Sequence, residues 1–246
     1  ALLIATVVTQ IGALTAEAAA APFAPAARTE NKRVAPSDGA AKDKFGISVG
    51  ISGNTMIVGS QAHDLGGVAN SGAAYIYERN RGGAGNWGLV KKLQAVDRAA
   101  NDQLGIAVAI SGDTAVVGAF AEDDGGLINN GKVYVFERDA GGANNWGHVA
   151  ILLGSKRASD DWFGKAVAID GDTIVVGAPR DWGPGGSTDV GHGQVYVFER
   201  GAASPNAWNE VASWRHPGSV KNDQLGGSVA ISGDTIAVTA HGKDGQ

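Results

Sequence analysis

The chain has 246 residues, including 38 glycines and no cysteine, and carries a formal net charge of −5. The lack of cysteine excludes disulfides, cysteine-ligated zinc and a cysteine nucleophile, and an acidic balance without any run of Lys or Arg argues against a nucleic-acid-binding surface. Glycine excess without a collagen period predicts many tight turns, as in a protein built of short β-strands.

The first 22 residues are predicted to be the remnant of a signal peptide. The apolar run ALLIATVVTQIGAL is followed by TAEAAAAPFAPA, whose small residues offer cleavage sites after Ala18 or Ala21. No initiator Met or basic segment precedes the run, so we expect the chain to be cut at its N-terminus. The run is too short and too interrupted by Thr and Gln to span a bilayer. We therefore expect a secreted or cell-surface protein with no membrane insertion of the mature chain; an Ala-rich helix or a disordered leader is the alternative. Residues 23–42 are expected to form a linker.

One pattern recurs four times between residue 43 and the C-terminus, as in DWFGKAVAIDGDTIVVGAP. The copies begin at Asp43, Asp102, Asp161 and Asp223. A second shared segment follows each of the first three copies, for example GKVYVFER, and a Gly/Asn/Ala-rich stretch then leads to a Trp. The three Trp residues are Trp87, Trp146 and Trp208. Internal repeats of this kind indicate a modular fold.

Each unit is predicted to contain four short strands. In the second unit the first three are residues 106–110, 114–119 and 132–138, and the fourth follows Trp146. The first two strands are joined by Ser-Gly-Asp-Thr or a close variant, which predicts a tight hairpin because glycine tolerates a positive φ at the first central position. No segment of the repeat has a sustained helical period.

The strands are apolar on both faces, which predicts an all-β fold of the β-propeller type. In VYVF, Val133 and Val135 point one way while Tyr134 and Phe136 point the other. Such a strand must be covered on both faces, and four-stranded antiparallel blades that cover one another satisfy this. A stacked solenoid is the alternative. The chain holds three complete units and half of a fourth, so we expect a fragment of a larger propeller with an unpaired edge and a bare apolar face.

The repeat resembles the FG-GAP repeat family. The FG positions are Phe45-Gly46, Leu104-Gly105, Phe163-Gly164 and Leu225-Gly226, and Gly177-Ala178-Pro179 is the clearest GAP segment. This family builds the β-propeller of integrin α subunits and occurs in many bacterial exported proteins. The resemblance implies a propeller used for extracellular adhesion or ligand binding, in which family members often carry calcium in a loop of the form D-x-D-x-D-G-x-x-D between FG and GAP.

That calcium loop is replaced in this chain by a short turn such as ISGDT, which cannot supply the six to eight oxygens that calcium prefers. The long loops after the second strand are the remaining place for a cation, because their glycines let backbone carbonyls approach it. The candidate calcium ligands are Glu122, Asp123, Asp124, Asp181 and Asp189. The alternative is that these carboxylates cap turns in a solvated loop. No other cofactor is predicted.

Aromatic residues divide into two groups by their place in the repeat. The recurring Trp residues are expected to pack between neighbouring blades, because repetition at one position favours a structural role. Trp162 and Trp182 lie off that register and are candidates for ligand contact. The Glu-Arg pairs, such as Glu137-Arg138, are expected to end a strand at the blade edge, and a modest surface ion pair is the alternative.

No catalytic motif is present: the sequence has no G-x-S-x-G elbow, H-E-x-x-H segment or phosphate loop. We therefore expect a non-enzymatic module that binds an extracellular protein or glycan through the loops on one face. Two alternatives stay open. One is a propeller hydrolase or lyase acting on polysaccharide, and the other is a purely structural module of a larger surface protein.

Overall fold

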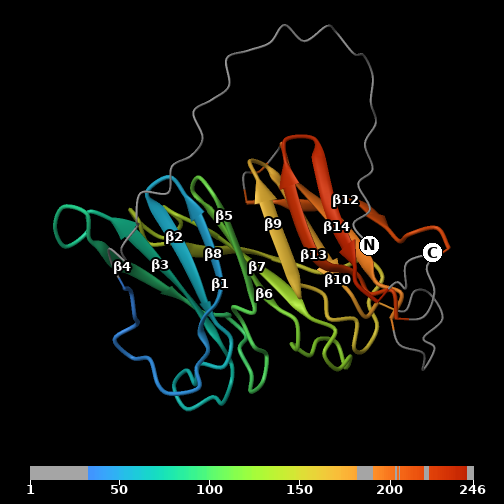
Figure 1. Cartoon of the computed structure of the whole chain (residues 1–246), viewed down its shortest axis with the longest axis horizontal. Coiled ribbons are helices and arrows are strands. Elements are labelled where there is room, and N and C mark those ends of the chain that lie inside the picture. The colour runs from blue at the N-terminus through green and yellow to red at the C-terminus, as the bar shows by residue number, and fades with distance from the viewer. Residues whose placement is uncertain (1–32, 182–190, 203, 205, 219–221, 243–246) are drawn as a thin grey trace, which may run out of the picture.

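The computed structural model describes residues 33–181, 191–202, 204, 206–218 and 222–242. These residues form three four-stranded antiparallel sheets and one two-stranded sheet (Figure 1). The all-β fold and the count of three complete units and half of a fourth are therefore confirmed. The expected signal-peptide remnant, residues 1–22, lies outside the described residues. In the described part, no helix is long and apolar enough to cross a bilayer.

Each complete repeat forms one sheet, here called a blade, whose strands pair in sequence order. Blade 1 comprises β1 (Phe45–Ser52), β2 (Thr55–Ser60), β3 (Ala73–Arg79) and β4 (Trp87–Leu93). Blade 2 comprises β5 (Ala107–Ser111), β6 (Thr114–Ala119), β7 (Lys132–Glu137) and β8 (Gly147–Leu152). Blade 3 comprises β9 (Ala166–Asp170), β10 (Thr173–Ala178), β11 (Gln194–Arg200) and β12 (Trp208–Trp214). The two-stranded sheet, blade 4, comprises β13 (Leu225–Ser232) and β14 (Thr235–Ala240).

A two-residue hairpin joins the first two strands of every blade. Ser52 pairs with Thr55 across the turn, so Gly53 and Asn54 are its central residues. The four hairpin glycines have φ between 53° and 56°. They are Gly53, Gly112, Gly171 and Gly233. A left-handed conformation at this position favours glycine, and the predicted turn is confirmed.

The first strands of the blades, β1, β5, β9 and β13, lie beside one another (Figure 1). The apolar core lies between consecutive blades, at contacts that we call junctions. At the junction of blades 1 and 2, Ile57 and Ile76 of blade 1 pack with Val117, Tyr134 and Trp146 of blade 2. Because the two faces of a blade serve two different junctions, its strands must be apolar on both sides.

The FG and GAP glycines of successive repeats meet at each junction. A Cβ atom on Gly59, Gly118 or Gly177 would lie 2.0 Å from a backbone oxygen of the next blade, which no real Cβ atom could occupy. Those oxygens belong to the FG glycines Gly105, Gly164 and Gly226. The repeat therefore conserves its glycines across its copies because two backbones touch there. In the fourth repeat, Thr239 takes the place of the GAP glycine.

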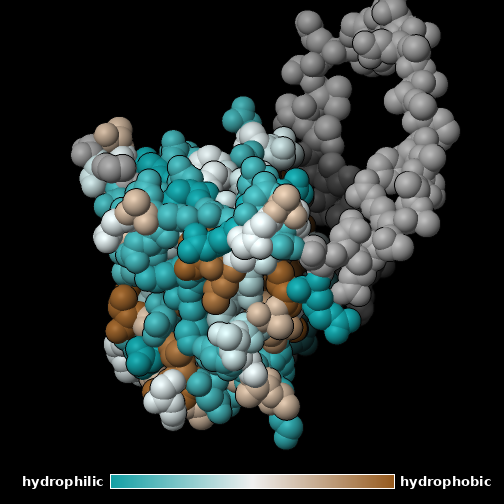
Figure 2. All heavy atoms as spheres, turned by 90° about the vertical axis from the view of Figure 1, so that its left-hand side faces the viewer, coloured by the Kyte–Doolittle hydropathy of each residue, from teal (hydrophilic) through white to brown (hydrophobic). Residues whose placement is uncertain are grey.

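Blade 1 has an open face on the side away from blade 2. Val49 and Ile51 of β1 are 67% and 61% exposed, whereas their equivalents Val108 and Ile110 in β5 are each 8% exposed. Figure 2 looks onto this side of the molecule and shows apolar atoms gathered among polar ones. The expected bare apolar face is present at blade 1.

Candidate functional site

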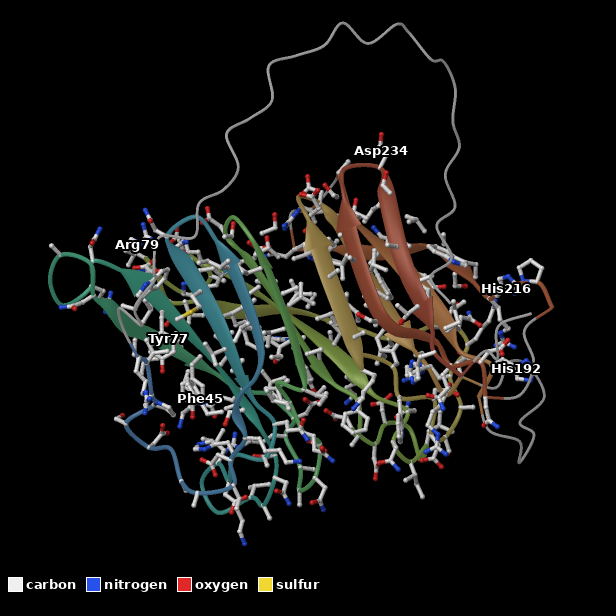
Figure 3. The ribbon with its side chains drawn as sticks, viewed as in Figure 1. Phe45, Tyr77, Arg79, His192, His216 and Asp234 are labelled. Carbon is white, nitrogen blue, oxygen red and sulfur yellow. The ribbon has the colours of Figure 1, made fainter. Side chains whose placement is uncertain are left out.

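The long connections lie at one end of the blades, here called the loop end, and the hairpins lie at the other. The loop end carries residues 61–72, 120–131 and the described part of 179–193, which follow the second strands. Figure 3 labels Asp234 at the hairpin end and His192 towards the loop end. The candidate residues that the structure describes therefore belong to the loop end or to a junction.

Asp123 caps a turn in its loop. Its Oδ1 accepts a hydrogen bond from the backbone N–H of Asn129 at 2.7 Å. Asp64 takes the same role in blade 1, where it accepts from the N–H of Asn70 at 2.8 Å. A side chain that holds its own loop in this way needs no metal to explain its presence.

Glu122 lies in a buried polar network at the loop end of blade 2. The Nζ of Lys132 donates to Glu122 and to Asp97, each at 2.7 Å. The Tyr134 hydroxyl lies within hydrogen-bonding distance of the same two carboxyl groups, and its single proton is donated to one of them at a time. Burial raises the pKa of Glu122, while the hydrogen bonds from Lys132 and Tyr134 oppose that rise. Asp124 pairs with Arg157 and with Lys132, and the hydrogen bond from Arg157 lowers the pKa of Asp124.

Asp181 has the equivalent position in blade 3 and is 1% exposed. It accepts from the Tyr196 hydroxyl at 2.7 Å and from Arg215 at 2.6 Å. Burial raises the pKa of Tyr196, and the neighbouring Asp181 carboxylate raises it further. In blade 1 the position belongs to His63, whose Nδ1 lies 2.8 Å from Asp43. Blades 1, 2 and 3 thus each tie this loop to buried polar partners through the residue at this position.

The acidic residues of the two loops do not converge. Glu122, Asp123 and Asp124 share one loop, whereas Asp181 belongs to the next blade, and Asp189 lies outside the described residues. Among the described residues, no group of three or more His, Asp or Glu side chains is arranged to hold a metal ion. The described carboxylates have cations or N–H donors as partners, and calcium binding at the loop end stays a prediction.

Trp162 lies at the junction of blades 2 and 3, at the loop end. The Arg180 guanidinium lies 4.4 Å from the centre of its ring system, and the Phe120 ring contacts it edge-on at 5.2 Å. Lys165 Nζ lies 4.2 Å from the Phe120 ring centre and 5.6 Å from that of Trp162. The structure therefore places Trp162 beside two cations and a second aromatic ring. Trp182, the other candidate for ligand contact, lies outside the described residues.

The recurring Trp residues have a structural role. Trp146 is 1% exposed within the core between blades 1 and 2, and the Arg138 guanidinium lies 4.7 Å from its ring centre. Arg200 stacks on Trp208 in the same way at 4.4 Å. The expected packing of Trp146 between blades is confirmed.

The Arg of the Glu-Arg pair does more than the sequence analysis expected. Arg138 donates to Asp113 of its own blade, and it also donates to Glu78 and Thr55 of blade 1. Arg200 repeats these contacts one blade later, with Asp172, Glu137 and Thr114 as partners. The Glu-Arg pair ends the third strand, as expected. The contacts that its Arg makes with the preceding blade were not predicted from the sequence.

The open face of blade 1 has a cavity. It lies at the position where the junction of blades 1 and 2 has the contacts of Arg138 and Trp146. It has a volume of about 680 Å³ and includes Ile51, Met56, Arg79 and Trp87 in its lining. The Arg79 guanidinium, labelled in Figure 3, lies 5.5 Å from the centre of the Trp87 ring system. Val34, from the stretch expected to be a linker, packs against the same blade and also lines the cavity.

The family model for the FG-GAP repeat matches residues 29–77, 87–136, 146–198 and 208–246. No curated protein matches the chain. Among solved structures, Sqt1 from Chaetomium thermophilum is similar at 17% sequence identity with a TM-score of 0.46, over 76% of this chain and 40% of that one. The chain thus spans less than half the length of that protein.

The last three matched segments begin at Trp87, Trp146 and Trp208, so each starts with the fourth strand of one blade. The segments 87–136 and 146–198 continue through the first three strands of the next blade, and 208–246 continues through the two strands of blade 4. A family unit defined in this way crosses a junction, which is where the recurring glycines and the Arg contacts lie. The chain belongs to the FG-GAP repeat family.

Proposed function

We propose that this FG-GAP repeat β-propeller module is an exported, non-enzymatic binding module that engages an extracellular protein or glycan through its loop end. The observation that carries the proposal is the difference between the recurring and the varying positions of the repeat. Residues at the hairpins and along the junctions recur from copy to copy, whereas residues at the loop end differ. A rigid scaffold with variable loops at one end is the usual arrangement of a binding surface.

The state of the buried carboxylates supports binding over catalysis. Glu122 is bonded to Lys132 and Tyr134, and Asp181 is bonded to Arg215 and Tyr196. A general acid or base must be free to exchange a proton with a substrate. Carboxylates that neutralise a lysine or arginine of their own blade are better suited to holding the loops in place.

Export is proposed from the apolar leader followed by small residues at the N-terminal end of the chain. A β-propeller without cysteine needs no oxidising compartment for its stability, so the fold is compatible with export but does not require it.

The experiment is a binding and turnover test on one panel. The purified chain is applied to immobilised extracellular-matrix proteins and to acidic and neutral polysaccharides, and the same polysaccharides are assayed for released reducing ends or unsaturated products. The proposal predicts saturable binding to at least one surface and no product. Release of product with multiple turnovers would favour the polysaccharide hydrolase or lyase, and no binding to any member of the panel would favour a structural module.

A further inference from the structure

Four side chains at the junction of blades 2 and 3 depart together from the repeat. We call them the Trp162 cluster: Phe120, Trp162, Lys165 and Arg180. The position of Trp162 holds Lys44, Gln103 and Gln224 in the other repeats. The position of Lys165 holds Ile47, Ile106 and Gly227. Ala62 and Ala121 correspond to Arg180, and Gln61 and Pro179 correspond to Phe120. Because the other junctions form without these residues, the fold does not need them.

The backbone presents the Trp162 position in the same way in every repeat. Trp162 has a φ of 60°, and the equivalent residues Lys44, Gln103 and Gln224 have φ values of 57°, 59° and 52°. A left-handed conformation favours glycine, yet every repeat has a long or bulky side chain there. The backbone N–H of Lys165 donates to the carbonyl of Trp162 at 3.1 Å and fixes the turn. The side chain at this position is therefore held in a defined place at the loop end.

The cluster brings two cations onto aromatic surfaces. Lys165 Nζ lies 4.2 Å from the centre of the Phe120 ring, and the Arg180 guanidinium lies 4.4 Å from that of Trp162. Phe120 is 8% exposed, whereas Trp162, Lys165 and Arg180 are half-buried and so keep contact with solvent. At the junction of blades 1 and 2, a hydrogen bond between Gln61 and Gln103 takes the place of this aromatic contact.

The cations of the cluster differ from Lys132 and Arg215, the cations of the buried polar networks in blades 2 and 3. Lys132 has Asp97, Glu122 and Asp124 as partners, and Arg215 has Asp181. Within the described residues, no carboxylate lies within ion-pair distance of Lys165 or Arg180. Burial lowers the pKa of Lys165, and the positive charge of the nearby Lys44 lowers it further. In the part of the chain that the structure describes, these two positive charges at the loop end therefore have aromatic rings and no carboxylate as partners.

We propose that the Trp162 cluster binds the carboxylate-bearing sugar of an acidic polysaccharide. A uronate ring has a flat C–H face that fits an aromatic side chain and a carboxylate that fits an ammonium or guanidinium group. The half-buried position strengthens both attractions, because the local dielectric is lower than in water. An acidic peptide also offers carboxylates. Its aspartate and glutamate side chains, however, have no flat ring face that could pack on the aromatic side chains of the cluster, as a sugar ring has. This inference rests on the proposed function, of which it names the ligand class.

The repeats themselves supply the variants for the test. Lys165→Ile, Trp162→Gln and Arg180→Ala replace each residue by one that another repeat has at the same position, so each variant is expected to fold. Lys165→Arg keeps the charge. Arg81→Ala removes an exposed cation between β3 and β4 of blade 1, far along the sequence from the cluster, and serves as the matched control. Thermal melting of each variant confirms that it is folded before binding is measured.

Binding is measured by isothermal titration calorimetry of the full chain with oligogalacturonate, neutral dextran oligomers and poly-L-glutamate. We expect the wild type to bind oligogalacturonate in preference to the other two, and to bind it more weakly at high salt. Lys165→Ile and Trp162→Gln should each weaken that binding by about tenfold or more, which corresponds to about 1.4 kcal/mol. Lys165→Arg and Arg81→Ala should leave it within about twofold of the wild type.

Three results would overturn the inference. If poly-L-glutamate binds as well as oligogalacturonate and Trp162→Gln has no effect, the site recognises acidic peptide and not a sugar. If the wild type binds a protein or a neutral glycan and Lys165→Ile leaves that binding intact, the proposed function stands and this inference fails. If the wild type binds no member of the wider panel, the two fail together.

Discussion

The backbone oxygen of Gly164 lies 2.0 Å from the point that a Cβ atom on Gly118 would occupy. Gly118 belongs to the GAP position of blade 2 and Gly164 to the FG position that leads into blade 3. The two elements that name the family are therefore the two sides of one backbone contact, made between successive repeats.

Gly118→Ala is predicted to destabilise the protein by about 2–3 kcal/mol, because the added methyl group must displace a backbone segment and not a flexible side chain. Thr239→Ser changes the equivalent position in blade 4 and keeps the hydroxyl that accepts a hydrogen bond from the Ser228 N–H at 3.0 Å, so it should cost no more than about 1 kcal/mol. Urea denaturation followed by tryptophan fluorescence gives both values. Equal costs for the two variants would show that the contact at Gly118 does not constrain the junction.

Arg138→Lys is predicted to destabilise the protein by about 1–2 kcal/mol, since lysine keeps the charge but cannot reach Asp113, Glu78 and Thr55 at once. Arg79→Lys is the matched control, because the Arg79 guanidinium forms no ion pair with any residue that the structure describes. That variant should change the free energy of unfolding by less than about 0.5 kcal/mol. The account would be contradicted if the control were as costly as Arg138→Lys.

Ile110→Ala and Ile51→Ala test whether blades bury each other's faces. The two residues occupy the same position in successive repeats, but Ile110 is 8% exposed and Ile51 is 61% exposed. Ile110→Ala should therefore cost about 2–4 kcal/mol, and Ile51→Ala less than about 1 kcal/mol. Chemical denaturation of the two variants under one buffer condition makes the comparison. Similar losses would mean that β1 is covered in solution.

Asp102→Asn is predicted to flatten the pH dependence of stability between pH 4 and pH 7. Burial raises the pKa of Asp102 from 3.8 to about 6, and the nearby Glu122 and Asp97 carboxylates add to the rise, against the Ala99 N–H and Lys132. A folded-state pKa above the unfolded value means that the folded protein binds the proton more tightly. The resulting stability is fully present below about pH 3.8 and is lost as the pH rises through 6.

Asparagine keeps an acceptor for the Ala99 N–H and does not ionise, so Asp102→Asn should gain stability relative to the wild type as the pH rises. Unfolding free energies at pH 4, 5.5 and 7 provide the check, with Asp123→Asn as an exposed control at a capping carboxylate. Parallel curves for the wild type and Asp102→Asn would rule out this role for the Asp102 carboxylate.

The fold followed from the sequence because its causes are local and repeated. The hairpin glycines such as Gly112 predict their turn, and a strand such as VYVF, with apolar residues on both faces, predicts its own covering. The reach of Arg138 to Glu78 was missed because the two residues are a full repeat apart, and only the stacking of blades brings them together.

The site was predictable in part. Trp162 stood out because it lies off the register of the recurring Trp residues. Its partners Lys165 and Arg180 did not stand out in the sequence. They are seen to be unusual only when they are compared with the residues at the same positions of the other repeats, and the structure is needed to show that these positions meet at one junction. The roles of Glu122 and Asp181 depended on Tyr134 and Tyr196, which reach them from neighbouring strands of the same blade.

The central claim is that the first strands of successive repeats lie side by side as neighbouring blades. Because the chain has no cysteine, a disulfide between engineered cysteines reports this directly. A Cβ atom on Gly50 of β1 would lie 3.5 Å from the Cγ2 of Ile110 in β5, whose side chain belongs to the core shared by blades 1 and 2. The two side-chain positions therefore face each other, as a disulfide requires. Oxidised Gly50→Cys/Ile110→Cys is predicted to form the intramolecular bond in the monomer, detected by non-reducing peptide mass spectrometry, while Gly50→Cys/Ile169→Cys is not. Failure of the first pair to close, or equal closure of both, would contradict the arrangement of the blades.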